Sequence, residues 1–311
     1  MDQKQQHPEI AILMATYNGQ RFLSEQLDSF ARQTFSNWRL IASDDKSKDN
    51  SLDILKTYQN TWGPDKLEIR HGPSKGYCQN FLNMACDPAI KADYYAFSDQ
   101  DDVWYPEKLQ VAIDYLATQD PTIPTVYCGR TTYVNENLKI IGQSPLFIYP
   151  RRFRNALVQS IAGGNTMVFN PAAKALIEAA GNLNVISHDW WLYIIVMAAG
   201  GKVFYDPNPY IYYRQHPNAL IGGNTSVAAI TERFIMAVSG RFKQWNDINI
   251  LALLQCRHLL TENALEILDL FLRLRNSHLI HRYRMIEVCG LYRQTRRGTI
   301  SLIIAAMLKK V

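Results

Sequence analysis

The chain has 311 residues, 47% of them hydrophobic and 20% charged, which suits a sizeable apolar core and excludes an intrinsically disordered chain. The formal net charge of +5 is too small to indicate nucleic-acid binding by itself. The five cysteines are odd in number and form no CxxC motif, so we expect reduced thiols. No apolar run approaches the roughly 20 residues of a membrane span, and the first residues are polar. We therefore expect a cytoplasmic protein, free or peripheral on the inner face of the cell membrane.

The first half of the chain alternates strand-like and helix-like segments. A continuous apolar run of strand length occupies residues 10–15, further strand-like segments occupy residues 38–43, 67–70 and 94–98, and apolar residues at helical spacing fill the intervals. This alternation predicts an α/β fold with a mostly parallel sheet and helices on both faces. In such folds ligands bind beyond the carboxyl ends of the strands.

The second half of the chain is less regular. We expect short strands at residues 166–169, 202–205 and 210–213, a helix at 171–180, and a buried helix at 190–199, which is apolar almost all round. Beyond Thr225 the pattern is helical to the end. We therefore divide the chain into an α/β domain, residues 1–224, and a helical C-terminal extension, residues 225–311.

Three carboxylates, those of Asp99, Asp101 and Asp102, follow the aromatic-rich strand-like segment 94–98 within four residues. They repel one another unless a cation neutralises them, and oxygen ligands of this kind suit Mg²⁺ or Mn²⁺ together with phosphate oxygens. The alternative is a solvated turn that caps the helix near Pro106. The position directly after a buried strand favours the metal site.

Two more polar clusters follow apolar strands. Tyr17 and Asn18 follow the first strand, and Asp44 and Asp45 follow the second. The acidic pair is either an ordinary polar loop or an acceptor for the base or ribose of a nucleotide, because a buried pair is costly without donors. The shared position at strand ends predicts one site at one edge of the sheet.

Two single motifs add candidates in the second half. Asp189 begins the apolar helix in HDWW and is either an N-cap or a general base whose pKa is raised by an apolar setting. Arg214 and His216 end a later strand in YRQH. They are either surface residues or ligands of a phosphate and a metal, respectively.

Together these segments resemble bacterial family 2 glycosyltransferases, in particular the rhamnosyltransferase-like branch of O-antigen and lipopolysaccharide biosynthesis. The resemblance covers about residues 10–223 and rests on ATYNGQRF, IASDDKSKDNS, FSDQDDVWYPEKL, GGNTMVFN, HDWWLY and YRQHPNALIG. It implies the GT-A fold, a Rossmann-like architecture. Lys46 departs from the pattern, because many relatives carry glycine after the acidic pair.

The resemblance also implies a role for each candidate residue. The expected nucleotide pocket is formed by Thr16, Tyr17, Asn18, Asp44 and Asp45. The donor sugar and the acceptor are expected to meet Gly163, Gly164 and Asn165. The Mn²⁺ or Mg²⁺ cofactor is expected at Asp99 and Asp101, with His216 completing the shell and Arg214 assisting at the diphosphate. Asp189 corresponds to the general base.

The implied activity is an inverting transfer of a sugar from a nucleotide donor, with L-rhamnose from dTDP-L-rhamnose as the first choice and a UDP-hexose as the alternative. The implied acceptor is a glycan linked to polyprenyl diphosphate, and no nucleic acid is expected as a partner. Among other classes, a nucleotidyltransferase would carry a glycine-rich basic loop after the first strand. An inactive sugar-binding scaffold would not need the complete acidic set.

The C-terminal tail combines an apolar segment with basic residues on either side of it. Residues 300–308, ISLIIAAML, are apolar and are flanked by Arg296-Arg297 and Lys309-Lys310. The segment is too short to span a bilayer, but flanking basic residues suit peripheral contact with an anionic membrane face. A core helix or a homodimer helix is the alternative.

Overall fold

The structure is a computed structural model that describes residues 8–215 and 240–311. His216 and the predicted domain boundary at residue 224 lie outside the described residues. The described strands are β1 (Ile10–Thr16), β2 (Trp38–Asp44), β3 (Leu67–His71), β4 (Tyr94–Ser98), β5 (Val103–Trp104), β6 (Thr125–Gly129), β7 (Thr132–Val134), β8 (Ile140–Gln143), β9 (Val168–Phe169), β10 (Lys202–Asp206) and β11 (Ile211–Arg214). The described helices are α1 (Leu23–Ala31), α2 (Ser51–Trp62), α3 (Tyr77–Ala85), α4 (Lys108–Leu116), α5 (Phe153–Ala156), α6 (Pro171–Ala180), α7 (His188–Ala198), α9 (Arg241–Gln255), α10 (Glu262–Asn276), α11 (Leu279–Cys289) and α12 (Arg296–Met307), with 3-10 turns η1 (Gly164–Thr166) and η2 (Arg257–Leu259).

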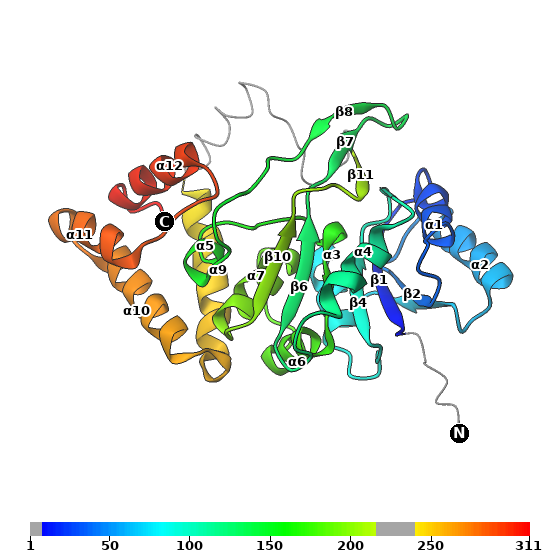
Figure 1. Ribbon diagram of the computed structural model, residues 1–311, viewed down its shortest axis with the longest axis horizontal. Coiled ribbons are helices and arrows are strands. Elements are labelled where there is room, and N and C mark those ends of the chain that lie inside the picture. Colours follow the sequence, from blue (N-terminus) through cyan, green and yellow to red (C-terminus); the bar gives the residue numbers. More distant parts are fainter. Residues whose placement is uncertain (1–7, 216–239) are drawn as a thin grey trace.

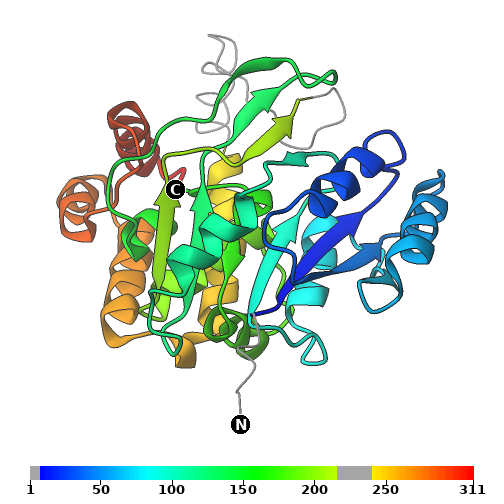
Figure 2. The same ribbon diagram turned by 45° about the vertical axis from the view of Figure 1, so that its right-hand side comes forward.

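The main sheet is mixed and mostly parallel, as the sequence predicted. Its strand order is β10-β6-β9-β4-β1-β2-β3. β1 pairs in parallel with β2 and β4, and only the short β9 runs antiparallel to its neighbours β4 and β6 within this described sheet. Helices lie on both sides of the sheet (Figures 1 and 2). The carboxyl ends of β1, β2 and β4 therefore meet at one edge.

The unbroken apolar run of β1 is explained by two separate cores. Ala11 and Leu13 pack into the core that α3, α6 and α7 help to form. Ile10, Ile12 and Met14, which point to the opposite face, pack with α1, α2 and α4. Because alternate side chains of a strand point to opposite faces, a strand buried on both faces must be apolar at every position.

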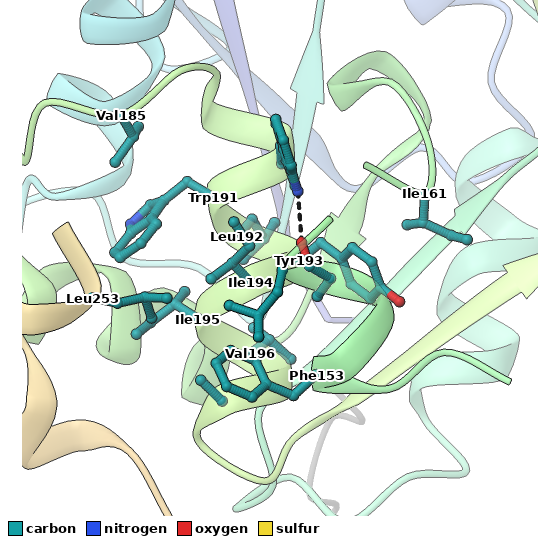
Figure 3. Close-up of a cluster of buried hydrophobic side chains, with 14 of the residues drawn as sticks. Phe153, Ile161, Val185, Trp191, Leu192, Tyr193, Ile194, Ile195, Val196 and Leu253 are labelled. Atoms are coloured by element: carbon teal, nitrogen blue, oxygen red, sulfur yellow. Dashed lines mark hydrogen bonds between the residues drawn. The ribbon is translucent and has the colours of Figure 1, made fainter. Parts of the chain in front are cut away.

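Helix α7 is buried all round, as its composition predicts. Trp191 and the residues that follow it as far as Val196 have no solvent exposure. Figure 3 shows this segment packed between Phe153 of α5 and Leu253 of α9. The helix begins at His188, so its first turn, which carries Asp189, is held by a large apolar cluster.

A second, four-stranded sheet with the order β5-β11-β7-β8 was not predicted from the sequence. β7 has three residues and β8 has four, and their pairing shifts register between Tyr133 and Val134. Strands this short and irregular leave no clear alternation in the sequence. The sheet brings β11 next to β5, which directly follows the acidic loop at residues 99–102.

The C-terminal region is helical, as predicted, and it is continuous with the main core. Leu253, Leu268 and Phe271 belong to the same buried cluster as Leu13 of β1. Figure 1 shows α9 beside α7 and β10, with α10, α11 and α12 on its outer side. Among the described helices, none combines the length and the apolar character that crossing a bilayer requires.

Candidate active site

The loop after β1 is tied to the acidic loop after β4 by Gln100. Its Oε1 accepts from the amide of Tyr17 and its Nε2 donates to the Tyr17 carbonyl oxygen, each over 2.9 Å. Gly19 leaves room for this side chain, since a Cβ at Gly19 would lie 2.2 Å from Gln100 Oε1. The side chain of Tyr17 remains exposed. The paired hydrogen bonds fix a backbone segment beside the acidic loop.

Asp44 is buried at the end of β2 and organises the polar loops. Its carboxylate accepts from the hydroxyl of Thr16 over 3.1 Å and from the amide of Ser47 over 2.9 Å. The hydroxyl of Ser47 also accepts from the amide of Asn18 over 2.8 Å. Thr16, Asn18 and Asp44 are thus brought together as predicted, through contacts within the protein. A contact of Asp44 with a pyrimidine base stays a prediction.

Asp45 fixes the loop that leads into α3. Its carboxylate oxygens accept from the amides of Ser74 and Gly76. Backbone donors of this kind satisfy the carboxylate oxygens within the protein. Asp45 therefore lies beside Asp44 as expected, but its oxygens face a loop of the protein.

The acidic loop is joined to the η1 turn by a buried hydrogen bond. Asp102 has no exposure, and its Oδ2 accepts from Nδ2 of Asn165 over 2.6 Å. Its Oδ1 accepts from the amide of Arg214 over 3.1 Å. Asp102 therefore connects the loop to η1 and β11. Asp99 and Asp101, on the same loop, are more accessible than Asp102.

Asp189 lies directly against the η1 turn. Its Oδ2 accepts from the amide of Gly164 over 3.2 Å, and its Oδ1 accepts from the amide of Trp190 over 2.6 Å. The N-cap of α7 is Ser187, so Asp189 occupies the first turn of the helix and not the cap position. Gly163 precedes the turn, and its carbonyl accepts from the hydroxyl of Thr166. Gly163, Gly164 and Asn165 thus lie between the acidic loop and Asp189.

The carboxylates of this edge influence one another. Burial and the negative charges of Asp101 and Asp189 raise the pKa of Asp99 to about 8. Burial and the charges of Asp99 and Asp102 also raise the pKa of Tyr213. The negative charges of Asp101 and Asp189 thus both act on Asp99, while the roles assigned to these three residues stay predictions.

The donor set fits a divalent cation that arrives together with a substrate. Within residues 8–215 and 240–311, no three His, Cys, Asp or Glu side chains are placed to hold a metal by themselves. Asp99 and Asp101 nevertheless supply two crowded carboxylates, and a cation would relieve their repulsion. Mg²⁺ commonly uses one or two carboxylates and completes its shell with water and substrate phosphates. His216, the third predicted ligand, lies outside the described part of the chain.

The side chain of Arg214 is engaged by groups of the protein and is not free to bind a phosphate. Its guanidinium is buried, stacks on Phe22 with 4.2 Å to the ring centroid, and donates to Glu25 Oε2 over 2.8 Å. It also donates to the carbonyl oxygens of Asp101 and Glu136. These bonds hold the acidic loop against α1 and the second sheet. A contact with a diphosphate stays a prediction and requires Arg214 to exchange partners.

Two residues of the site were missed at the level of sequence. Gln100 lies inside the acidic motif, but only the fold shows that it pairs with Tyr17. His188 is buried and stacks on Phe81 with 3.9 Å between ring centroids. Neither ring nitrogen of His188 has a hydrogen-bond partner among the described residues. In the sequence, only the position of His188 next to Asp189 indicated that it could belong to the site.

Comparison with known proteins agrees with this geometry. The family model described as Glycosyl transferase family 2 matches residues 11–177. The chain is 30% identical over 241 residues to the dTDP-rhamnosyl transferase RfbG of Shigella flexneri, an alignment that covers 71% of this chain and 77% of RfbG. The putative glycosyltransferase EpsE of Bacillus subtilis is 31% identical over 109 residues, which is 35% of this chain and 38% of EpsE.

Solved structures are similar at the level of the fold. TarS 1–349 of S. aureus in complex with UDP-GlcNAc has a TM-score of 0.51 at 14% identity, covering 97% of this chain and 90% of TarS. GalNAc-T7 with UDP, GalNAc and Mn²⁺ has a TM-score of 0.52 at 12% identity, covering 76% of this chain and 50% of that one. The chain belongs to glycosyl transferase family 2, with a GT-A fold, and is a nucleotide-sugar glycosyltransferase as the sequence predicted.

Proposed function

We propose that the protein is an inverting glycosyltransferase that moves L-rhamnose from dTDP-L-rhamnose to a lipid-linked glycan during the synthesis of O-antigen or another surface polysaccharide. The observation that carries the proposal is the hydrogen-bonded series from Asp102 through Asn165 and Gly164 to Asp189. It holds the Asp189 carboxylate against the η1 turn, and the same turn is tied to the acidic loop through Asn165. That arrangement suits a base and a diphosphate on opposite sides of one sugar.

The donor choice is supported by the relative RfbG, whose name specifies a dTDP-rhamnosyl transferase. A UDP-hexose is the alternative donor, since the TarS structure holds UDP-GlcNAc. Tyr17, Asn18 and Asp44 are proposed to form the nucleotide pocket, because they lie together at the strand ends with the acidic loop beside them. Asp44 would contact the pyrimidine base through exchange of one of its present donors.

The proposed chemistry needs one proton acceptor and no covalent intermediate. Asp189 removes the proton of the acceptor hydroxyl as that oxygen bonds to the anomeric carbon. The bond between the anomeric carbon and the diphosphate oxygen breaks in the same step, so the configuration inverts. The Gly164 amide holds the Asp189 carboxylate in place.

The leaving diphosphate gains negative charge during the transfer. Asp99 and Asp101 would hold Mn²⁺ or Mg²⁺, which as a Lewis acid offsets that charge. Mn²⁺ is present in the GalNAc-T7 structure. Gln100 and Arg214 fix the backbone of the loop that carries both carboxylates, so their role is to position it.

Thermal-shift screening of the chain with dTDP-L-rhamnose, UDP-glucose and UDP-N-acetylglucosamine, each with Mn²⁺, tests the donor. A ligand that binds only the native state raises the melting temperature by mass action. We expect dTDP-L-rhamnose to give the largest shift. NMR of the product formed with a lipid-linked glycan then tests the inversion. A larger shift with a UDP-sugar, or a product with retained configuration, would contradict the proposal.

A further inference from the structure

A cavity of about 650 Å³ lies between the segment that precedes α5 and the beginning of α12. Tyr149 and Arg152 line it on one side, and Tyr292, Arg293 and Arg296 line it on the other. This volume is within the range of pockets that hold small molecules. The pocket uses none of the residues assigned to the sugar transfer.

Three arginines supply positive charge to this cavity without a matching acid. Within the described parts of the chain, Arg152, Arg293 and Arg296 form no ion pair with a carboxylate. Arg293 is the most enclosed, and its Nε donates only to the carbonyl oxygen of Val158, over 3.1 Å. Burial lowers the pKa of Arg293 to about 10, so it still carries its charge at neutral pH. Its guanidinium also lies over the ring of Phe242, 4.4 Å from the ring centroid, so the charge has a π partner but no acidic one. An anion in the cavity would add the missing charge partner.

The first turn of α12 adds to the positive potential. Arg296 is the first residue of this helix, and its first turn contains no acidic residue. The N-terminus of a helix carries a partial positive charge, which disfavours a cation and favours an anion there. An anion bound at this end of the helix would offset the charge of Arg296 and the partial charge of the helix together. Phosphate is the anion that arginine and helix N-termini bind most readily.

The cavity opens toward apolar surface. Ile300, which lines it, is 58% exposed, and Ile304 and Leu308 on the same face of α12 are 40% and 52% exposed. Ile148, next to the cavity residue Tyr149, is 71% exposed. Apolar side chains at positions i, i+4 and i+8 form one stripe along a helix. A ligand that fits has an anionic group and a hydrocarbon chain.

We propose that this cavity binds the phosphate or diphosphate group of a lipid, with the hydrocarbon chain lying along Ile300, Ile304 and Leu308. A lipid is preferred to a free phosphate ion because the cavity is much larger than phosphate and continues into the apolar stripe. The inference does not rest on the sugar donor or on the chemistry of transfer.

The cavity is connected to the catalytic edge through α5. Asn155 of α5 donates to the carbonyl oxygen of Tyr292 over 3.0 Å. Nε1 of Trp190, the residue after Asp189, donates to the carbonyl oxygen of Ala156 over 2.7 Å. One short helix therefore contacts both the cavity wall and the first turn of α7.

Calorimetric titration of the full chain with farnesyl diphosphate in EDTA tests the inference. We expect saturable binding, and at least tenfold weaker binding of inorganic pyrophosphate, which lacks the hydrocarbon. Arg296→Gln should weaken farnesyl diphosphate binding about tenfold, the effect of losing one charge-assisted hydrogen bond. Arg297→Gln is the matched control, because Arg297 is exposed on the same helix but does not line the cavity, and it should bind normally.

Several outcomes would overturn the inference. A specific cavity site is excluded if farnesyl diphosphate does not bind. It is also excluded if Arg296→Gln and Arg297→Gln weaken the binding of farnesyl diphosphate equally. Equally tight binding of pyrophosphate indicates a site for free phosphate. Binding to phosphatidylglycerol vesicles without binding of farnesyl diphosphate indicates contact with a membrane surface only. Titration of Asp101→Ala separates this site from the donor site: unchanged binding of farnesyl diphosphate is expected, and its loss would place the ligand in the donor site instead.

Discussion

The imidazole of His188 fills the space where a side chain at position 164 would lie, since a Cβ on Gly164 would be 2.2 Å from His188 Nε2. The ring cannot easily withdraw, because it stacks on Phe81 and meets the ring of Phe97 edge-on. Gly164 thus allows the η1 turn to approach α7 closely enough for its amide to reach Asp189. The identity of residue 164 is set by its neighbour 24 positions along the chain, not by a turn conformation.

Replacement of this glycine tests the close approach. Gly164→Ala should destabilise the fold by about 1–3 kcal/mol, as overpacking does, and should lower kcat because the η1 turn moves away from Asp189. Urea denaturation and initial rates measure both effects. In the double variant Gly164→Ala/His188→Ala the overlap is removed. Its loss of stability should therefore be smaller than the sum of the losses in the two single variants. Strict additivity would show that the two side chains do not interact.

His188 also predicts a pH dependence of stability. Burial lowers its pKa to about 4, from the ordinary value of 6.5. Between these values the unfolded chain binds a proton that the folded chain does not. The free energy of unfolding therefore falls as the pH decreases from 6.5 to 4, by up to about 3 kcal/mol from this residue, and the effect is absent above pH 6.5. Urea denaturation at pH 7 and pH 4.5 should show a smaller loss in His188→Phe than in the wild type. An equal loss would mean that His188 is not neutral in the folded protein.

The acidic loop predicts metal-dependent donor binding. In the wild type, Mn²⁺ should tighten the binding of dTDP by about tenfold or more, because the cation links the diphosphate to the carboxylates. Asp101→Ala should abolish this dependence and bind dTDP equally with Mn²⁺ and with EDTA. Asp65→Ala, at an exposed position, is the control and should behave as the wild type. Persistent activity of the wild type in EDTA would exclude the metal role.

Lys46 predicts a stabilising substitution. Its φ is +69°, in the left-handed region that costs a residue with a side chain about 1–2 kcal/mol. The loss of backbone entropy with glycine offsets part of this gain, so Lys46→Gly should raise the stability by up to about 1 kcal/mol. Lys48→Gly is the control, since Lys48 has no positive φ, and it should not stabilise the protein. A fall in melting temperature for Lys46→Gly would contradict this reading.

The same torsion angle explains a feature of the sequence. The resemblance to family 2 glycosyltransferases implies glycine at the position of Lys46, and the positive φ gives a physical reason for glycine there. Lys46 keeps the geometry of the loop after β2 at a cost in strain. The neighbouring acidic residues Asp44 and Asp45 retain buried positions and their hydrogen bonds.

The main sheet and the edge that carries the site were predictable because burial leaves a direct pattern in sequence. β1 is apolar at nearly every position since both faces are covered, and α7 is apolar all round since it is enclosed. Parallel strands end at a common edge, so polar residues after β1, β2 and β4 had to be neighbours. The position of these residues directly after the strands was sufficient to predict that they share one edge of the sheet.

The contacts within the site were not predictable, because they join residues far apart in sequence. Asp102 and Asn165 are 63 positions apart, and Gln100 and Tyr17 are 83 apart. Such hydrogen bonds depend on tertiary packing and leave no periodic signal. Arg214 illustrates the same point: its place at a strand end was expected, whereas its burial against Phe22 was not.

The central claim is that Asp189 takes the proton of the acceptor hydroxyl, and single-turnover kinetics of Asp189→Asn tests it most directly. Asparagine keeps the shape and an oxygen for the Gly164 amide but cannot act as a base. The rate of transfer from dTDP-L-rhamnose should fall at least about a hundredfold, while the dissociation constant of dTDP changes less than threefold. A variant that transfers sugar at the wild-type rate would show that Asp189 is not the base and would contradict this account of the site.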